Sequence, residues 1–415
     1  MKAYKSLEVT MELLKLLVVF AVVIVMVAKT GKMSTAVIVG SLVCWVLYGI
    51  PLSTGAITVI NTVTAVNTLK MILVMYSITF LQRMMEKKNA ITTARDGLSG
   101  LFNSRWVNCA AAPIFIGLLP SPNAAFIAGD MVEASASDYL SKEEMAVTTS
   151  YFRHISEAFL PTYQNIILAL ALTGYTASQF VVGMLPMVAV LIILGILFFL
   201  RGKVPNKVEG GVKSENKAED AKKVAGLWPI LAAIVLIVGF NMQTVTAALI
   251  VIAVYFVVGR FKFSDIKPFF LSAFESKIVF NTLAVYTFKE FLTLSGAIKL
   301  LPDFFAKFPI PTFLIYVLIF LFGTLVAGSL TMTASVLPIA MATVPNAGMP
   351  LVCLLMMTSY IAMQVSPTHI CLSIIAEHFD VSLGDMVKKT LPLLLTFMPI
   401  AIAYYLLLTS LGFGM

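Results

Sequence analysis

Two short Pro-Thr steps contain the side chains of this sequence that are best suited to chemistry. Leu160-Pro161-Thr162-Tyr163 and Ser366-Pro367-Thr368-His369 each interrupt a long apolar segment, 206 residues apart. A proline inside a helix removes one backbone N–H and clashes with the carbonyl four residues earlier, so each helix should split there. The second half would then begin with unpaired N–H groups and a partial positive charge, which attract an anion. The freed carbonyls could bind a cation.

Polar turns also interrupt two other apolar stretches. Pro120-Ser121-Pro122-Asn123 lies within 93–136, and Gly328-Ser329-Leu330-Thr331-Met332-Thr333 lies within 299–344. Backbone broken at membrane depth is tolerated only where protein or water covers it, so each turn is predicted to be the tip of a re-entrant hairpin. Together the four stretches predict a substrate site formed by Ser121, Asn123, Thr162, Gln164, Asn165, Ser329, Thr331, Thr333, Ser366, Thr368 and His369. The alternative is that the hydroxyls only bond their own helix backbone and the prolines only kink it.

Five ionisable residues lie close to these turns. Arg153, His154 and Glu157 precede the first Pro-Thr step, while Asp130 and Glu133 follow the first hairpin tip. Ionisable groups are costly in lipid and are therefore paired or functional. Arg153 or His154 could attract a carboxylate, and the acidic groups or His154 could carry protons, so the five are predicted to couple ion movement. The structural alternative is an ion pair, or snorkelling to a nearby membrane surface.

The elements that hold these residues are predicted to be membrane-spanning helices. Of 415 residues, 59% are hydrophobic and 12% charged, and the mean hydropathy is +0.95, so one water-soluble core cannot hide the apolar surface. The formal charge of +8 is scattered between apolar runs, which argues against nucleic acid as a partner. The four cysteines lie far apart without a CxxC pair, so no disulfide framework, metal site or cofactor is predicted.

Apolar length predicts ten full spans in an all-α polytopic membrane protein. They are 10–28, 33–50, 56–81, 145–172, 176–200, 224–241, 243–259, 272–295, 349–378 and 389–411. The only long hydrophilic linker, 201–223, divides the chain into halves. Loops on the linker side hold 19 basic residues and loops on the other side hold four, which predicts a cytoplasmic linker, with both termini outside, in a cell inner (plasma) membrane.

An internal repeat predicts two inverted halves. Thr149-Ser150-Tyr151 recurs as Thr358-Ser359-Tyr360, and the hairpin tips and Pro-Thr steps recur at nearly the same offset. Each half then has about five transmembrane helices, one re-entrant hairpin and one Pro-broken helix, and an odd number of crossings makes the halves antiparallel. The predicted repeats are 1–200, with scaffold spans 1–81 and a transport part 93–172, and 224–415, with scaffold spans 224–295 and a transport part 299–378.

In these features the chain resembles the ion transporter superfamily, with its gluconate, citrate, C4-dicarboxylate and arsenite permeases and sodium/proton antiporters. Within it the chain looks closest to a prokaryotic family of integral membrane proteins with no assigned substrate. The resemblance covers nearly the whole chain and implies a homodimer in which scaffold domains stay fixed and transport domains move like elevators. The sodium-coupled dicarboxylate branch has Ser-Asn-Thr at its hairpin tips, whereas this chain has Ser121-Pro122-Asn123 and Ser329-Leu330-Thr331, which favours protons over sodium as the coupling ion.

The predicted function is secondary active transport of a small organic anion, with a carboxylate as the favoured class, across the lipid bilayer. A sodium/proton antiporter or a passive channel of the same fold remains open. An intramembrane aspartyl protease is the alternative from another class, because Gly129-Asp130 and Gly384-Asp385 match the dipeptide of such enzymes. No HExxH, prenyl-diphosphate or phosphate-binding motif accompanies them, so the chain is predicted not to be an enzyme.

Overall fold

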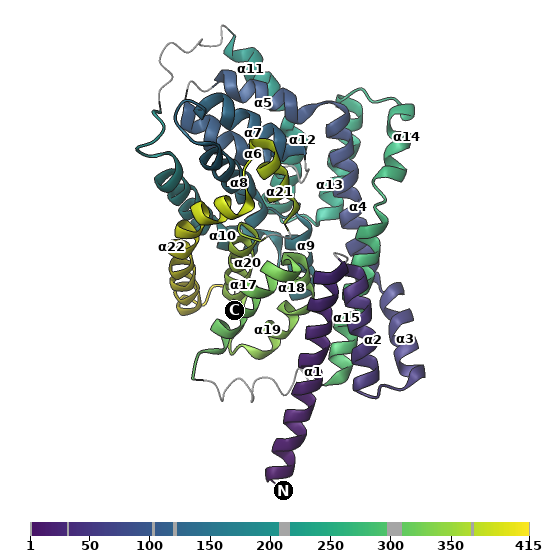
Figure 1. Cartoon of the computed structure of the whole chain (residues 1–415). Coiled ribbons are helices and arrows are strands. Elements are labelled where there is room, and N and C mark those ends of the chain that lie inside the picture. The colour runs from purple at the N-terminus through teal and green to yellow at the C-terminus, as the bar shows by residue number, and fades with distance from the viewer. Residues whose placement is uncertain are drawn as a thin grey trace.

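The chain is helical throughout the part that its computed structural model describes, which is residues 2–30, 33–101, 104–118, 123–206, 216–296, 309–366 and 369–414 (Figure 1). Two groups of helices pack side by side. The α4 group comprises α1 (Lys2–Thr30), α2 (Met33–Leu47), α3 (Leu52–Thr64), α4 (Val66–Lys87), α12 (Trp228–Ile234), α13 (Thr244–Val258), α14 (Phe263–Ser272) and α15 (Ser276–Ser295).

The α8 group contains the helices that flank both Pro-Thr steps and most of the described helices of the two predicted hairpins. It comprises α6 (Ala112–Ile116), α7 (Asn123–Ala136), α8 (Lys142–Phe159), α9 (Gln164–Thr173), α10 (Ala177–Gly195), α17 (Thr312–Ala327), α18 (Ser329–Ser335), α19 (Leu337–Thr343), α20 (Met349–Met363), α21 (Ile370–Phe379) and α22 (Leu383–Ser410). Two further helices, α5 (Ala90–Leu101) and α11 (Lys217–Val224), pack against each other at one end of the molecule (Figure 1).

Several helices are too short to cross a bilayer alone. By length and composition, four helices of the described part could cross a membrane, or five if α3 and α4 form one bent span, whereas the sequence predicted ten. Six more apolar helical stretches of the described part have 10–17 residues, and one of them, Leu14–Val23, lies within α1. A helix of 15 residues is about 22 Å long, against about 30 Å of hydrocarbon, so a helix of that length does not cross a bilayer alone. The protein is a multi-pass membrane protein.

The predicted span 56–81 is bent, because α3 and α4 meet at Ala65 at an angle of 43°. Just before the bend, the Thr62 hydroxyl donates to the Thr58 carbonyl at 2.7 Å and the Thr64 hydroxyl donates to the Ile60 carbonyl at 2.8 Å. Such bonds compete with the helical N–H groups for the same carbonyls and bend helices. The two threonines therefore give a local reason for the bend.

The chain turns back on itself within the second predicted hairpin region. α17 ends at Gly328, whose φ of 83° and ψ of 157° turn the chain, and α18 packs back against α17. The two helices approach so closely that a Cβ at Gly323 would lie 2.1 Å from the Met332 sulfur. α6 and α7 also pack against each other, and the tip between them, including Ser121, lies outside the described residues.

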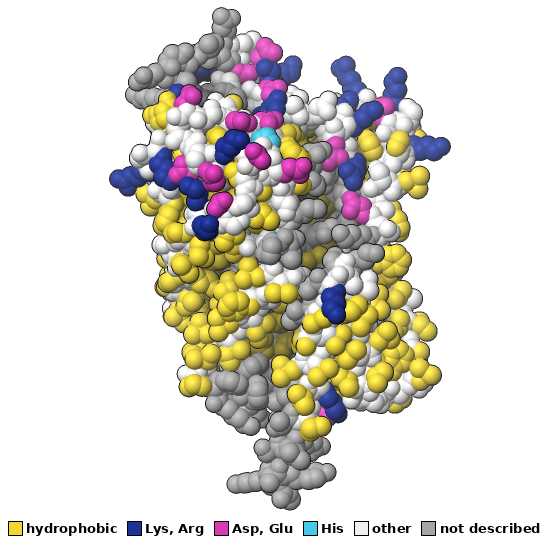
Figure 2. All heavy atoms as spheres, viewed as in Figure 1, with side chains coloured by type: hydrophobic (Ala, Val, Ile, Leu, Met, Phe, Trp, Pro, Cys, Tyr) yellow, Lys and Arg dark blue, Asp and Glu magenta, His cyan; other side chains and the backbone are white. Residues whose placement is uncertain are grey.

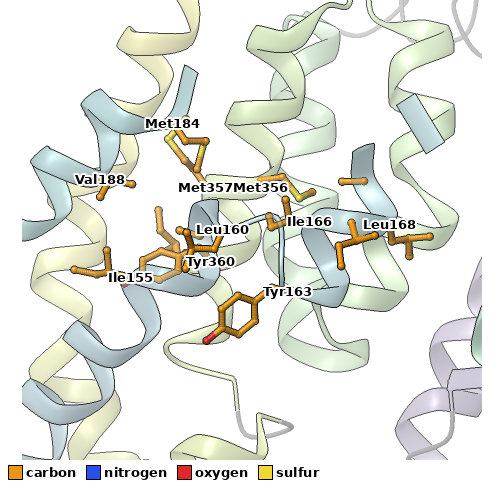
Figure 3. Close-up of a cluster of buried hydrophobic side chains, with 14 of the residues drawn as sticks. Ile155, Leu160, Tyr163, Ile166, Leu168, Met184, Val188, Met356, Met357 and Tyr360 are labelled. Atoms are coloured by element: carbon orange, nitrogen blue, oxygen red, sulfur yellow. The ribbon is translucent and has the colours of Figure 1, made fainter. Parts of the chain in front are cut away.

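The core of the α8 group lies where α8 and α20 cross. Every residue of α20 from Met349 to Ala362 is buried. The Tyr360 hydroxyl donates to the Tyr151 carbonyl at 3.3 Å, so the two copies of the repeated Thr-Ser-Tyr tripeptide meet. Figure 3 shows Leu160 and Tyr163 of the first helix break gathered with hydrophobic side chains of α20. This packing fixes the position of the break.

The molecular surface divides into a charged end and an apolar middle. Figure 2 shows Lys, Arg, Asp and Glu side chains gathered at the end of the molecule that carries α5, α11 and α14. Hydrophobic side chains cover the part below it, as expected for a surface in contact with lipid.

Candidate functional site: a cavity at two helix breaks

A cavity of about 680 Å³ lies between the α4 group and the two helix breaks. α4 lines one wall from Met75 to Glu86, and Glu275 lies beside it. The facing wall is formed by Glu157, the stretch Thr162–Asn165, Ser329, Leu330, Met363 and His369. The cavity therefore gathers polar side chains from both halves of the sequence.

Both broken helices restart at this cavity. α8 ends at Phe159 and α9 begins at Gln164, so the chain is non-helical across the Leu160-Pro161-Thr162-Tyr163 step. α20 ends at Met363 and α21 begins at Ile370, directly after His369. The first turn of each new helix has N–H groups without helical acceptors and carries the positive end of the helix dipole. Two positive helix ends therefore lie at one polar cavity.

Arg153 and Glu157 form a buried ion pair at the helix-break wall of the cavity. An Arg153 Nη1 hydrogen donates to the Glu157 carboxylate one helical turn away, and Nη1 also lies 3.7 Å from the Cys371 sulfur. The Arg153 side chain is 2% exposed and that of Glu157 is 12% exposed. Glu157 lines the cavity, and Arg153 lies behind it. In this conformation the pair is neutral and the guanidinium is withheld from the cavity.

Two histidines, one from each half, touch behind the same wall. The His154 and His369 Nε2 atoms lie 2.9 Å apart. The His154 Nδ1 lies 2.5 Å from the Ser150 carbonyl, which can only accept, so Nδ1 holds the proton of a neutral His154. The His154 Nε2 then accepts a hydrogen bond from His369, by inference from the partners. A hydrogen bond between imidazoles thus links the two broken helices.

The same neighbourhood contains three side chains that could ligate a metal by distance. The ligand atoms of His154, His369 and Cys371 lie within 4.8 Å of one another. However, the Arg153 guanidinium already contacts both the Cys371 sulfur and the Glu157 carboxylate. A permanent positive charge at that position opposes a second cation. We therefore assign no metal to this cluster.

Three buried polar atoms of residues that line the cavity have no hydrogen-bond partner within the described part of the chain. Thr162 Oγ1 and Asn165 Oδ1 belong to the helix-break wall, and Arg83 Nε belongs to the α4 wall, where other atoms of the same guanidinium pair with Glu86 and Glu275. Thr162 is only 2% exposed. Buried polar atoms in native proteins nearly always have a partner, which can be a water molecule or a ligand. Thr162 and Asn165 therefore mark the part of the wall most suited to hold a polar ligand.

The structure brings six of the predicted site residues together and places others elsewhere. Glu157, Thr162, Gln164, Asn165, Ser329 and His369 line the cavity. The Thr331 hydroxyl instead donates to the Ala327 carbonyl at 2.7 Å, and the Ser366 hydroxyl donates to the Leu325 carbonyl at 3.0 Å. Thr331 bonds a carbonyl four residues earlier, as the structural alternative predicted, whereas Ser366 bonds a carbonyl of a different helix, α17.

The remaining predicted residues do not reach the cavity or are not described. Thr333 is buried outside it, and its hydroxyl has no partner among the described residues. The side chains of Asp130 and Glu133 are about half exposed, each 3.8 Å from His378. Ser121 and Thr368 lie outside the described residues, and only the backbone of Asn123 is described.

Sequence reasoning missed the α4 wall of the site. Arg83 pairs with Glu86 at 2.9 Å on α4 and with Glu275 at 3.2 Å. Gln82 and Thr79 complete this polar face. The i,i+3 spacing of Arg83 and Glu86 is a local signal, but contact with residue 275 depends on tertiary packing. Tyr163, which lines the cavity and donates to the Gly117 carbonyl, was also missed.

Comparisons with known proteins identify the family of the chain and find similar solved structures, one of which is described below. The model of the family described as "Protein of unknown function (DUF401)" matches residues 10–407. No protein with a curated description matches. Among solved structures, the crystal structure of the YdaH transporter of Alcanivorax borkumensis is similar over 86% of this chain and 88% of that chain, with 14% identity and a TM-score of 0.48.

Proposed function

The chain belongs to the family described as "Protein of unknown function (DUF401)", and for this member we propose secondary active transport of a small organic anion coupled to protons. The observation that carries the proposal is the shared cavity, at which two interrupted helices restart beside an Arg-Glu pair and two of the unpartnered polar atoms. We also propose that the chain is related to the ion transporter superfamily, which its sequence resembles.

An anion is the favoured substrate because helix N-termini and hydrogen-bond donors converge on the helix-break wall of the cavity. The first turns of α9 and α21 present partial positive charge, and the Thr162 hydroxyl and the Gln164 amide offer hydrogen-bond donors. A carboxylate accepts several such bonds at once, and bonds to a charged acceptor are the stronger ones. Small carboxylates are therefore the proposed substrate class.

Proton coupling follows from the position of Glu157. While Glu157 is ionised it neutralises Arg153 and adds negative charge to the cavity, which repels an anion. A proton on Glu157 removes both effects, so that Arg153 needs another negative partner. The anion then serves as that partner. Proton and anion thus bind together, and by linkage each raises the affinity for the other.

Two inverted halves remain the proposed architecture. α7, α8, α9 and α10 begin at residues 123, 142, 164 and 177, and α18, α20, α21 and α22 begin at 329, 349, 370 and 383. The differences are 206, 207, 206 and 206 residues, which supports a duplication that includes hairpin, broken helix and final span. A cytoplasmic linker with antiparallel halves around it, in a plasma membrane, agrees with the charged end in Figure 2.

Movement is proposed to occur between the two groups of helices. The cavity lies at their boundary, with α4 and Glu275 on one side and the two helix breaks on the other. In the elevator mechanism, the α8 group would slide past the α4 group and carry the bound anion across the membrane. The α4 group would form the fixed scaffold and the contact of a homodimer.

Uptake by the purified protein in liposomes tests the function. Acetate, succinate, citrate and gluconate would be offered under an imposed pH gradient. Accumulation of one of them above its equilibrium level, abolished when the gradient is collapsed, supports proton-coupled transport. Equilibration without accumulation would indicate a passive channel. Sodium-driven proton movement without carboxylate uptake would indicate an antiporter.

A further inference from the structure

Three cavities follow one another along α4. The first, at the helix breaks, is lined by α4 residues from Met75 to Glu86. A small second cavity of about 20 Å³ is lined by Met71 and Met75. A third cavity of about 550 Å³ is lined by α4 residues from Asn67 to Val74. Met75 is shared by the first two and Met71 by the last two, so the cavities form a line.

The same helix break separates the outer two cavities. Thr162 and Tyr163 line the first cavity, while the preceding residue, Pro161, lines the third. Between the two cavities, the narrow second one is lined mainly by Met71, Met75, Leu168, Leu330 and polar groups of α15. The third cavity therefore approaches the proposed anion site from the opposite end of α4, behind a thin barrier of flexible apolar side chains.

Lys70 is the charged side chain that lines the third cavity. The described residues that line this cavity include no acidic side chain, and no acidic residue of the described part pairs with Lys70. Amides of Asn67, Asn241 and Gln243 and the phenols of Tyr175 and Tyr286 surround the same space. All of these side chains can donate hydrogen bonds, and a lysine along a spanning helix is costly unless it faces water or a partner.

We propose that the Lys70 cavity is a vestibule that recruits a small carboxylate on the side of the barrier opposite the first cavity. The inference rests on the proposed transport function and adds a second anion site to it. The Lys70 ammonium raises the local concentration of anions, and the surrounding donors hold the carboxylate until the barrier residues move apart. Acidic lipid headgroups share this anionic-oxygen chemistry, so the test includes both sources.

Thiol labelling tests the charge of the vestibule without requiring transport. Asn67 lines the cavity one helical turn from Lys70, and the four native cysteines are buried, so Asn67→Cys provides a single reporter and the parental protein is the blank. Anionic and cationic methanethiosulfonate reagents would be compared in phosphatidylcholine vesicles. Side chains at i and i+3 lie about 6 Å apart, where one charge in water changes each rate about threefold, so Lys70→Gln should lower the anion-to-cation rate ratio about tenfold.

Lys70→Arg is the matched control, because it keeps the charge and should keep the ratio. Succinate added to the medium should slow labelling of Asn67→Cys with Lys70 present and not with Lys70→Gln. If Lys70→Gln left the anion-to-cation ratio of labelling rates unchanged, the proposed vestibule would be refuted. Slowing by phosphatidylglycerol in the vesicles, with no effect of succinate, would assign the cavity to lipid headgroups and overturn substrate recruitment.

A transport assay separates failure of this inference from failure of the proposed function. With carboxylate supplied on the vestibule side, Lys70→Gln should raise the apparent KM about threefold or more and leave kcat unchanged. From the linker side KM should not change. Charge-selective labelling without any carboxylate transport would refute the proposed function. The same result would still support a positively charged vestibule at Lys70. Transport with an unchanged KM from both sides would overturn the recruitment role alone.

Discussion

Replacement of Glu157 by glutamine separates anion binding from the proton. The glutamine side chain would keep nearly the same shape while losing the charge that neutralises Arg153 and faces the cavity. The substitution therefore imitates a permanently protonated Glu157. An anion should bind to Glu157→Gln at high pH as well as the unmodified protein binds it at low pH.

The expected size of the effect follows from one linked proton. If one proton must bind to Glu157 for each anion, the apparent Kd of the unmodified protein can rise at most about tenfold for each pH unit. The upper limit between pH 6 and pH 8 is therefore about a hundredfold. In Glu157→Gln the same interval should change Kd by less than about threefold.

Isothermal titration with a carboxylate that the uptake screen identifies measures these constants directly. Glu86→Gln is the matched control, since it makes the same chemical change in the same cavity but on the α4 wall, where Glu86 pairs with Arg83. The control should keep the steep pH dependence. Thermal unfolding of each variant would show that the fold is retained, because loss of one partner of a buried pair can cost about 3–5 kcal/mol.

A steep pH dependence that persists in Glu157→Gln would refute the linkage. So would binding that disappears in Glu157→Gln while the variant remains folded, because an unpaired Arg153 should favour the anion. A loss of pH dependence in Glu86→Gln would move the proton site to the α4 wall.

Three further substitutions test separate parts of the account. Thr162→Val should weaken carboxylate binding about threefold to tenfold by removing one hydrogen bond, and titration would measure it. Gly117→Ala should destabilise the fold by about 1–3 kcal/mol in thermal unfolding, because its Cβ would lie 2.2 Å from the Arg153 carbonyl oxygen. Gly226→Ala is its control, with nothing within 4 Å of the added carbon. Met71→Ser should thin the barrier between the cavities and allow carboxylate to leak down its gradient in liposomes, whereas an intact seal would show that Met71 is not part of the barrier.

The helix breaks could be predicted because proline and glycine act locally. Pro161 removes one helical hydrogen bond, and the chain is non-helical at residues 160–163, as predicted. Proline alone does not decide where a helix breaks, because Pro392 and Pro399 lie inside α22. The offset of about 206 residues predicts an internal repeat, and the Tyr151-Tyr360 contact shows the two tripeptides meeting in the core. Local chemistry thus predicted where the polar wall of the cavity is formed.

Other features depend on tertiary packing and could not be predicted. His154 and His369 are in contact although they are 215 positions apart in the sequence. The residues around each histidine do not indicate whether its partner is the other histidine or water. Asp130 and Glu133 lie outside the cavity, about half exposed beside His378, and their predicted role in ion coupling stays a prediction. Residues near a membrane-embedded turn can face either direction, and only packing decides which.

A structure of the protein in a lipid nanodisc at low pH, with the identified carboxylate bound, tests the central claim most directly. The account predicts density for the carboxylate beside Thr162, Asn165 and His369, with the Glu157 side chain moved away from Arg153 and the anion in its place. Carboxylate density elsewhere, or an Arg153-Glu157 pair unchanged beside a bound anion, would contradict it.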